Sequence, residues 1–175
     1  MSKRYKIKIF WALAKDTRLS LIEKLVAAFI YTLDYADKKC TANDKYISNQ
    51  LTIPKRAVEK AIMNLETYCL IEDLRDDPTS YQILVCNKSI CKKGYFKLSV
   101  ELLESDLDIS TIFLYGYIST FNTSERTCFS TSKTIGESLG LTICEVKKGL
   151  KELKNIGWLK IFEKKESTRE LKILI

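Results

Sequence analysis

The spacing of apolar residues over 130–161 predicts two short helices joined by a tight turn. Ile135 and Leu139 are four residues apart, which places them on one face of the first helix. Gly140 follows, where a helix often ends in the left-handed conformation that glycine adopts at least cost. Thr142 and Glu145 have the spacing of a capping box and predict the start of the second helix. Its apolar stripe consists of Val146, Leu150 and Leu153.

The same order of helix, turn and helix is predicted upstream, over 43–73. Ile47 and Leu51 form the inner face of the first of these helices. Pro54 stands at the start of the next helix, where its missing N–H costs nothing. The apolar residues of that helix are Val58, Ile62 and Leu65. Strand-like segments close each copy, so the pattern predicts an internal repeat.

The two copies also begin alike, with a short alternating segment followed by an apolar helix. Ser20 and Glu23 predict the start of the first such helix through another capping box. Leu19-Ser20 is matched by Ile109-Ser110, an offset of 90 residues. Ile47 is matched by Ile135, an offset of 88 residues, so we expect a loop two residues shorter in the second copy.

These patterns predict a mainly helical α+β fold with small β-hairpins, divided into two tandem units at 1–88 and 89–175. The boundary is placed in the segment 86–94, after which the chain begins its second copy. We expect Ile22, Val58 and Leu65 in the first core, and Ile112, Val146 and Leu153 in the second. The alternative is a single helical domain with accidental self-similarity.

The helix–turn–helix order followed by strands resembles a winged helix, and the resemblance covers nearly the whole chain. It is closest to the winged-helix modules of bacterial plasmid and phage replication proteins, including RepA-type initiators and DnaD-like primosome proteins. The residues that carry it are Leu19, Ser20, Ile47, Leu51, Ile53, Val58 and 65–71, with their second-copy counterparts. The first copy departs from the pattern at Thr52, where glycine is common, and at Pro54, where a capping hydroxyl is common. Transcription regulators share this module, so both replication and transcription remain open.

The resemblance implies that the second helix of each unit enters the major groove of double-stranded DNA. Taking Val146 as pointing inward, the helical period directs Lys148 and Lys151 outward. The residues expected to contact DNA are Lys45, Lys55, Arg56 and Lys60 in the first copy, and Lys133, Lys147, Lys148, Lys151, Lys164, Lys165 and Arg169 in the second. Arg75 is a further candidate in the first hairpin. The alternative is that these lysines form an ordinary solvated helix face.

Charge is consistent with a DNA partner, because the net charge of +7 suits a ligand rich in phosphate. A second hypothesis is a protein-interaction module, with a homodimer or a replication or transcription protein as its partner. Tyr31, Tyr35, Tyr115 and Tyr117 lie on or beside the first helices and are candidates for such docking.

Other functions are disfavoured by composition. No apolar run reaches the roughly 18 residues of a membrane helix, and the N-terminus has no signal-peptide pattern, so we expect a cytoplasmic protein without a membrane partner. Histidine is absent, and Cys86 and Cys91 are a single pair where a structural zinc site needs four ligands. We therefore expect no metal, no cofactor and no enzymatic activity. A site of carboxylates alone is the remaining enzymatic alternative.

Overall fold

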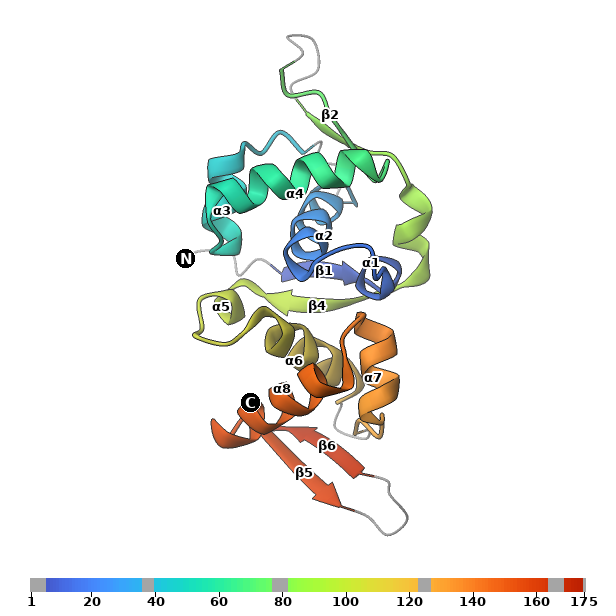
Figure 1. The fold of residues 1–175 in the computed structure, drawn as a ribbon, viewed down its shortest axis with the longest axis vertical. Coiled ribbons are helices and arrows are strands. Elements are labelled where there is room, and N and C mark those ends of the chain that lie inside the picture. The colour runs from blue at the N-terminus through green and yellow to red at the C-terminus, as the bar shows by residue number, and fades with distance from the viewer. Residues whose placement is uncertain (1–5, 36–39, 77–81, 123–126, 164–168, 175) are drawn as a thin grey trace. The chain divides into compact units, whose positions relative to one another are not determined.

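Helices and short antiparallel strand pairs alternate along the chain (Figure 1). The computed structural model describes residues 6–35, 40–76, 82–122, 127–163 and 169–174. The elements are β1 (Lys6–Phe10), α1 (Trp11–Lys15), α2 (Leu21–Tyr35), α3 (Asp44–Leu51), α4 (Lys55–Thr67), β2 (Ile71–Asp73), β3 (Ile83–Val85), the 3-10 helix η1 (Lys88–Lys93), β4 (Tyr95–Ser99), α5 (Val100–Leu103), α6 (Ile109–Phe121), α7 (Ser132–Leu139), α8 (Ile143–Asn155), β5 (Leu159–Glu163) and β6 (Arg169–Ile173). The predicted α+β class is confirmed. None of the described helices has the length and apolar character needed to span a membrane.

The chain forms two compact units, Met1–Ser105 and Asp106–Ile175. This division falls later than the one expected from the sequence, between residues 88 and 89. The reason is β4, which pairs antiparallel with β1 from Lys6 opposite Ser99 to Phe10 opposite Tyr95. The apolar residues of both strands are buried in one core, so the segment 89–105 belongs with the first unit.

Helix α2 is the centre of the first unit and lies between β1 and α4 (Figure 1). All its residues from 23 to 32 are buried, because neighbouring elements cover it on several sides. Lys24 is among them, and its Nζ donates a hydrogen bond of 2.7 Å to the carbonyl oxygen of Ala14. Ile22, expected in the core, is only half-buried because it lies in the first turn, beyond this covered stretch.

The remaining core predictions are confirmed. Buried residues include Val58, Leu65, Ile112, Val146, Leu150 and Leu153. From α2 onward the helices of the two units match at a constant offset of 88 residues: α2, α3, α4 and β2 begin at 21, 44, 55 and 71, and α6, α7, α8 and β5 at 109, 132, 143 and 159. The expected offset of 90 for the first helices is therefore wrong. Helix α6 begins after the N-cap Asp108, so the counterpart of Ser20 is Asp108.

A polar contact between helices recurs at the same offset. In the first unit, the Asn64 side-chain amide on α4 donates to the Glu23 carboxylate on α2. In the second unit, the Thr111 hydroxyl on α6 donates to Glu152 on α8 at 2.7 Å. Both contacts join residues 41 positions apart, and they use equivalent positions with different chemistry. The first contact holds α4 against α2, and the second holds α8 against α6.

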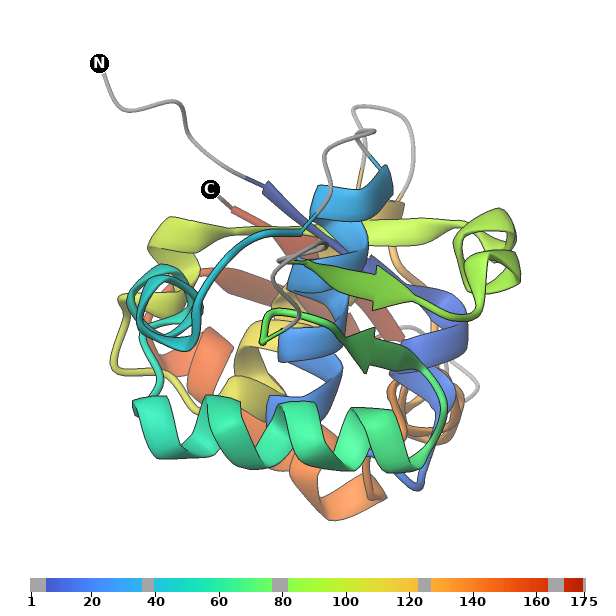
Figure 2. The ribbon, with the colours of Figure 1, turned by 90° about the horizontal axis from the view of Figure 1, so that it is seen from above.

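A backbone bridge ties each hairpin to the segment before the middle helix. Ile83 N–H donates to the Cys40 carbonyl at 2.7 Å, and Leu171 N–H donates to the Cys128 carbonyl at 2.8 Å. Both cysteines are buried, whereas Cys69, Cys86 and Cys144 are exposed. Seen from above, β2 and β3 of the first hairpin lie side by side (Figure 2).

Candidate nucleic-acid interface

Helix α8 is fixed at its start by the predicted capping box. Thr142 N–H donates to the Glu145 carboxylate at 2.7 Å, and Glu145 N–H donates to the Thr142 hydroxyl at 3.2 Å. The apolar stripe of the helix is buried against its own unit. Four lysines of the helix are exposed: Lys147, Lys148, Lys151 and Lys154. The helical phase predicted from Val146 is confirmed.

The two carboxylates of α8 already have partners within the protein. Glu145 caps the helix, and Glu152 accepts the hydrogen bond of Thr111. Lys148 Nζ lies 2.5 Å from the Asp108 carboxylate, and this hydrogen bond raises the pKa of Lys148. Both side chains are more than half exposed, at 70% and 55%, so solvent screens the pair and a phosphate could replace the carboxylate. Within the described residues, Lys147 and Lys151 form no ion pair.

Three residues in or beside the second hairpin are expected from the sequence to contact DNA: Lys164, Lys165 and Arg169. Lys164 and Lys165 lie outside the described residues. Arg169 is half-buried, and its Nη2 donates to the Ser132 hydroxyl of α7 at 2.7 Å. Burial lowers the pKa of Arg169. The contact with Ser132 links β6 to α7, and contact of Arg169 with DNA stays a prediction.

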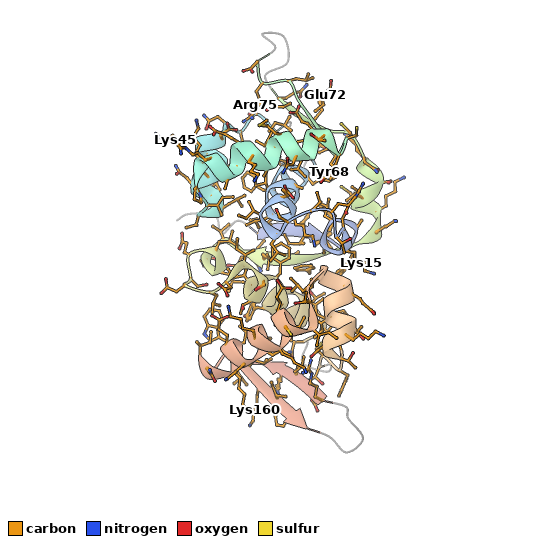
Figure 3. All side chains as sticks on the ribbon, in the orientation of Figure 1. Lys15, Lys45, Tyr68, Glu72, Arg75 and Lys160 are labelled. Atoms are coloured by element: carbon orange, nitrogen blue, oxygen red, sulfur yellow. The ribbon has the colours of Figure 1, made fainter. Side chains whose placement is uncertain are left out.

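Sequence reasoning missed two exposed lysines on this hairpin. Lys160 on β5 lies directly opposite Lys172 on β6 in the strand register. Both are exposed, and Figure 3 labels Lys160. The signal that could have found them is the alternation of β5 and β6, which places every second residue on the solvent side.

Helix α4 of the first unit also exposes cations, but acids lie among them. Arg56 and Lys60 are exposed, as the sequence predicts. Lys55 Nζ lies 2.9 Å from the Glu59 carboxylate one turn later, and this contact raises the pKa of Lys55. The cationic face of α4 is therefore smaller than that of α8.

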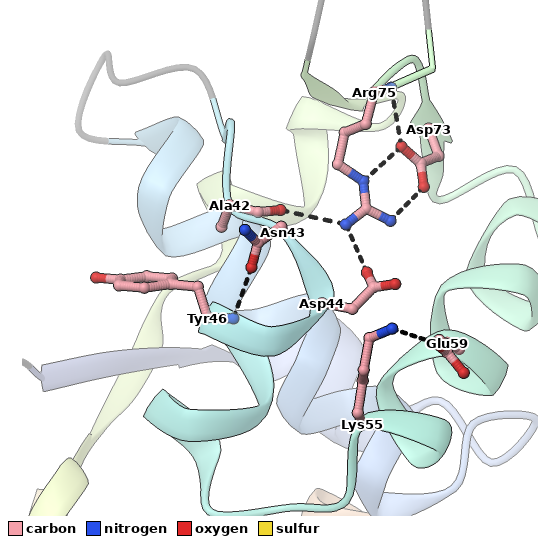
Figure 4. A network of polar contacts seen from close by, with 8 residues as sticks. All are labelled: Ala42, Asn43, Asp44, Tyr46, Lys55, Glu59, Asp73 and Arg75. Atoms are coloured by element: carbon pink, nitrogen blue, oxygen red, sulfur yellow. Dashed lines mark hydrogen bonds and ion pairs between the residues drawn. The ribbon is translucent and has the colours of Figure 1, made fainter.

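Beside α4, Arg75 is held in a polar network instead of facing solvent (Figure 4). Its guanidinium lies 2.5 Å from Asp44 and 2.5 Å from Asp73, and it also donates to the Ala42 carbonyl at 3.2 Å. Burial alone would raise the pKa of Asp73, but the hydrogen bonds and charge of Arg75 outweigh burial and lower it. Arg75 therefore fastens the first hairpin to α3, which makes it a poor candidate for phosphate contact.

A groove of about 690 Å³ follows this network along α4. Its lining residues are Asn43, Asp44, Lys45, Lys55, Glu59, Ile62, Met63, Glu66, Asp73, Arg75 and Asp76. Five carboxylates face three cations there, and two of those cations are already paired with acids. Such a groove repels phosphate more than it attracts it.

The two middle helices present equivalent lysines near their N-termini. Lys45 and Lys133 are exposed at matching positions of α3 and α7. The caps are Asn43, whose side chain accepts from Tyr46 N–H, and Thr131, whose hydroxyl accepts from Thr134 N–H. Lys133 has no acid close enough for an ion pair among the described residues, whereas Lys45 lines the acidic groove.

Two of the tyrosines considered for docking are core residues. The Tyr31 hydroxyl donates to the Leu70 carbonyl at 2.9 Å, and the Tyr117 hydroxyl lies 3.1 Å from the Ser130 hydroxyl. Tyr115 is half-buried with its ring 5.6 Å from that of Trp158. These contacts give Tyr31 and Tyr117 a packing role instead of a docking role.

The described residues contain no group of three or more metal-ligating side chains placed to hold an ion. Comparison with protein-family models, with curated proteins and with solved structures returned no match. What the chain does must therefore be inferred from its own residues.

Proposed function

We propose that the chain is a sequence-specific double-stranded DNA-binding protein, built of two winged-helix units, in which α8 enters the major groove. Three helices followed by a hairpin in each unit support the winged-helix resemblance: α2, α3, α4 with β2–β3, and α6, α7, α8 with β5–β6. The additional backbone bridges at Cys40 and Cys128 fit the same architecture, because they place a third extended segment beside each hairpin.

The observation that carries the proposal is the exposed face of α8. Lys147, Lys148 and Lys151 project from its first three turns, while its two carboxylates are engaged within the protein. A helix of this width fits the major groove, and lysines along it can neutralise phosphates on either side. Lysine near the start of the helix can also donate to guanine.

The local distribution of charge distinguishes the two units. In the second unit, Lys133 and the α8 lysines offer cations with few competing acids. In the first unit, Arg56 and Lys60 are available, but the groove beside them carries five carboxylates. We therefore assign most of the phosphate binding to the second unit.

The resemblance to winged-helix modules of plasmid and phage replication proteins is the only support for a biological setting. We propose replication initiation or transcriptional control of a plasmid, a phage or another mobile element.

A second candidate function is protein docking by the first unit. It is favoured by the same groove, where Arg75 is held by Asp73 and Asp44 and five carboxylates line the wall shared with Lys55. In this view the first unit holds a protein partner or a second copy while the second unit holds DNA.

A salt series with a random duplex tests the proposal. Binding should weaken as salt rises, with a slope of log K against log salt near 0.9 for each phosphate neutralised. Four lysine contacts would give a slope of about 3 to 4. Absence of binding at low salt, or binding that does not depend on salt, would favour the docking function instead.

A further inference from the structure

A second surface of the C-terminal unit combines lysines with exposed aromatic rings. It is the solvent side of the β5–β6 hairpin, here termed the hairpin face, and consists of Phe129, Lys160, Phe162, Glu170 and Lys172. Lys160 lies opposite Lys172, and Phe162 lies opposite Glu170. Residues opposite one another in an antiparallel pair point to the same side of the sheet. Leu159, just before Lys160, and Leu171, between Glu170 and Lys172, are 2% and 0% exposed and face the core.

Phe129 joins this face through the bridge beside β6. Cys128 and Leu171 exchange backbone hydrogen bonds of 3.2 and 2.8 Å, and both side chains are buried. The next residue, Phe129, therefore turns to the solvent side, where it is 53% exposed. Phe162 is 38% exposed. Glu170 falls between the two rings in the register, and its carboxylate accepts a hydrogen bond of 2.9 Å from the Thr127 hydroxyl.

The facing pair of lysines lowers the stability of the folded protein when no ligand is bound. Like charges directly opposite one another destabilise an antiparallel pair, and Lys160 and Lys172 are such a pair. Lys160 Nζ also lies 5.0 Å from the centre of the Phe162 ring, so cation and aromatic face form one continuous surface. An anion placed over both lysines would relieve their repulsion.

The first unit does not share these features at the equivalent positions. There, Glu72 and Leu84 lie opposite one another, where the second unit has Lys160 and Lys172. Thr41 precedes α3 where Phe129 precedes α7. Figure 3 labels both Glu72 and Lys160 on their strands. The lysines and rings are therefore particular to the second hairpin and not a requirement of the fold.

We propose that the hairpin face binds single-stranded DNA. Unpaired bases can stack on exposed phenylalanine rings, whereas the bases of a duplex are already stacked on one another. Lys160 and Lys172 would neutralise phosphates of the same strand. An acidic protein segment would satisfy the lysines but would leave the two rings without a matching group, so single-stranded DNA fits the face better. This inference uses residues outside α8 and goes beyond the proposed duplex binding.

The test is binding of a fluorescent oligothymidine of about 15 nucleotides to the full chain, measured by anisotropy at low salt. Phe129→Ala with Phe162→Ala should weaken binding by about thirtyfold or more, because each ring removes a stacked base. Lys160→Ala with Lys172→Ala should lower the salt slope by about 1.4, near 0.7 for each contact with a single strand. Glu72→Ala with Leu84→Ala is the matched control from the first unit and should leave binding unchanged.

Folding and the identity of the site are checked separately. Phe129→Leu with Phe162→Leu retains apolar volume but removes the rings, so it should still lose stacking while circular dichroism stays unchanged. All hairpin-face variants should keep duplex binding, whereas Lys148→Ala with Lys151→Ala should lose duplex binding and keep oligothymidine. Failure of the proposed duplex function and failure of this inference are thus distinguishable.

Several results would overturn the inference. The inference fails if oligothymidine does not bind at low salt, or if the hairpin-face variants bind it as tightly as the unaltered protein. It also fails if polyglutamate competes for the protein as well as unlabelled oligothymidine does. Tighter binding of oligouridine by about tenfold or more would also overturn it, because the ligand would then be RNA.

Discussion

Thr52 ends α3 in the same left-handed conformation in which Gly140 ends α7. Their φ and ψ angles are 56° and 38° for Thr52, and 65° and 37° for Gly140. This conformation costs a β-branched residue about 1–2 kcal/mol and costs glycine little. Thr52→Gly should therefore raise the free energy of unfolding by about 0.5–1 kcal/mol, after allowing for the greater freedom of glycine in the unfolded chain. Urea unfolding measures the change.

The reciprocal substitution, Gly140→Thr, is the control for Thr52→Gly and should destabilise the protein. A loss of stability in Thr52→Gly would show that the threonine side chain makes a contribution that outweighs its backbone conformation.

Ser48 on α3 and Gly136 on α7 are equivalent positions, and at each one the turn that follows the helix approaches it closely. A Cβ added at Gly136 would lie 2.6 Å from the Leu141 carbonyl oxygen. In the first unit the Ser48 hydroxyl instead donates to the Ile53 carbonyl at 2.6 Å. Gly136→Ala should lower the free energy of unfolding by about 1–3 kcal/mol, because the turn must shift to make room.

Thermal unfolding of Gly136→Ala can be compared with that of Glu137→Ala, which alters an exposed neighbour on the same helix. Equal stability of the two variants would mean that the turn adjusts freely, contrary to the geometry.

The ion pair between Asp73 and Arg75 predicts a pH dependence of stability. Arg75 lowers the pKa of Asp73 below its ordinary value of 3.8, so the folded protein holds this proton less tightly than the unfolded chain. The resulting stabilisation is present above about pH 4 and is lost as the pH falls through the lower folded value. Asp73→Asn should cost about 1–2 kcal/mol at pH 7, and the difference should shrink below pH 4.

Urea unfolding at pH 7, 5 and 3 measures this dependence, with the exposed Asp76→Asn as the matched control. A deficit in Asp73→Asn that is the same at all three values of pH would contradict the assignment of the charge to this pair.

The helix pairs could be predicted from the sequence because their signals are local. The spacing of Ile135 and Leu139, and the capping box of Thr142, depend only on residues within one or two turns. Strand pairing was not predictable in the same way. The alternation in β1 indicates a strand, but nothing local identifies β4 as its partner or assigns the segment 89–105 to the first unit.

In the candidate site, too, local features could be predicted from the sequence and long-range contacts could not. Exposure of Lys148 and Lys151 followed from the helical period, which acts along one element. The capture of Arg75 by Asp44 did not, because the two residues are 31 positions apart and meet only in the folded chain. The facing of Lys160 and Lys172 likewise depends on strand register, which the alternation alone does not determine.

Paired substitutions in the two units distinguish duplex binding by α8 from duplex binding by α4. Lys148→Ala with Lys151→Ala removes exposed cations of α8, and Arg56→Ala with Lys60→Ala removes those of α4 without disturbing either core. Salt-dependent duplex binding should be measured for both variants. The α8 variant should lose affinity and its salt slope should fall by about two units, whereas the α4 variant should change less. If a folded variant with the α8 substitutions binds duplex DNA as the unaltered protein does, α8 is not the DNA-binding helix.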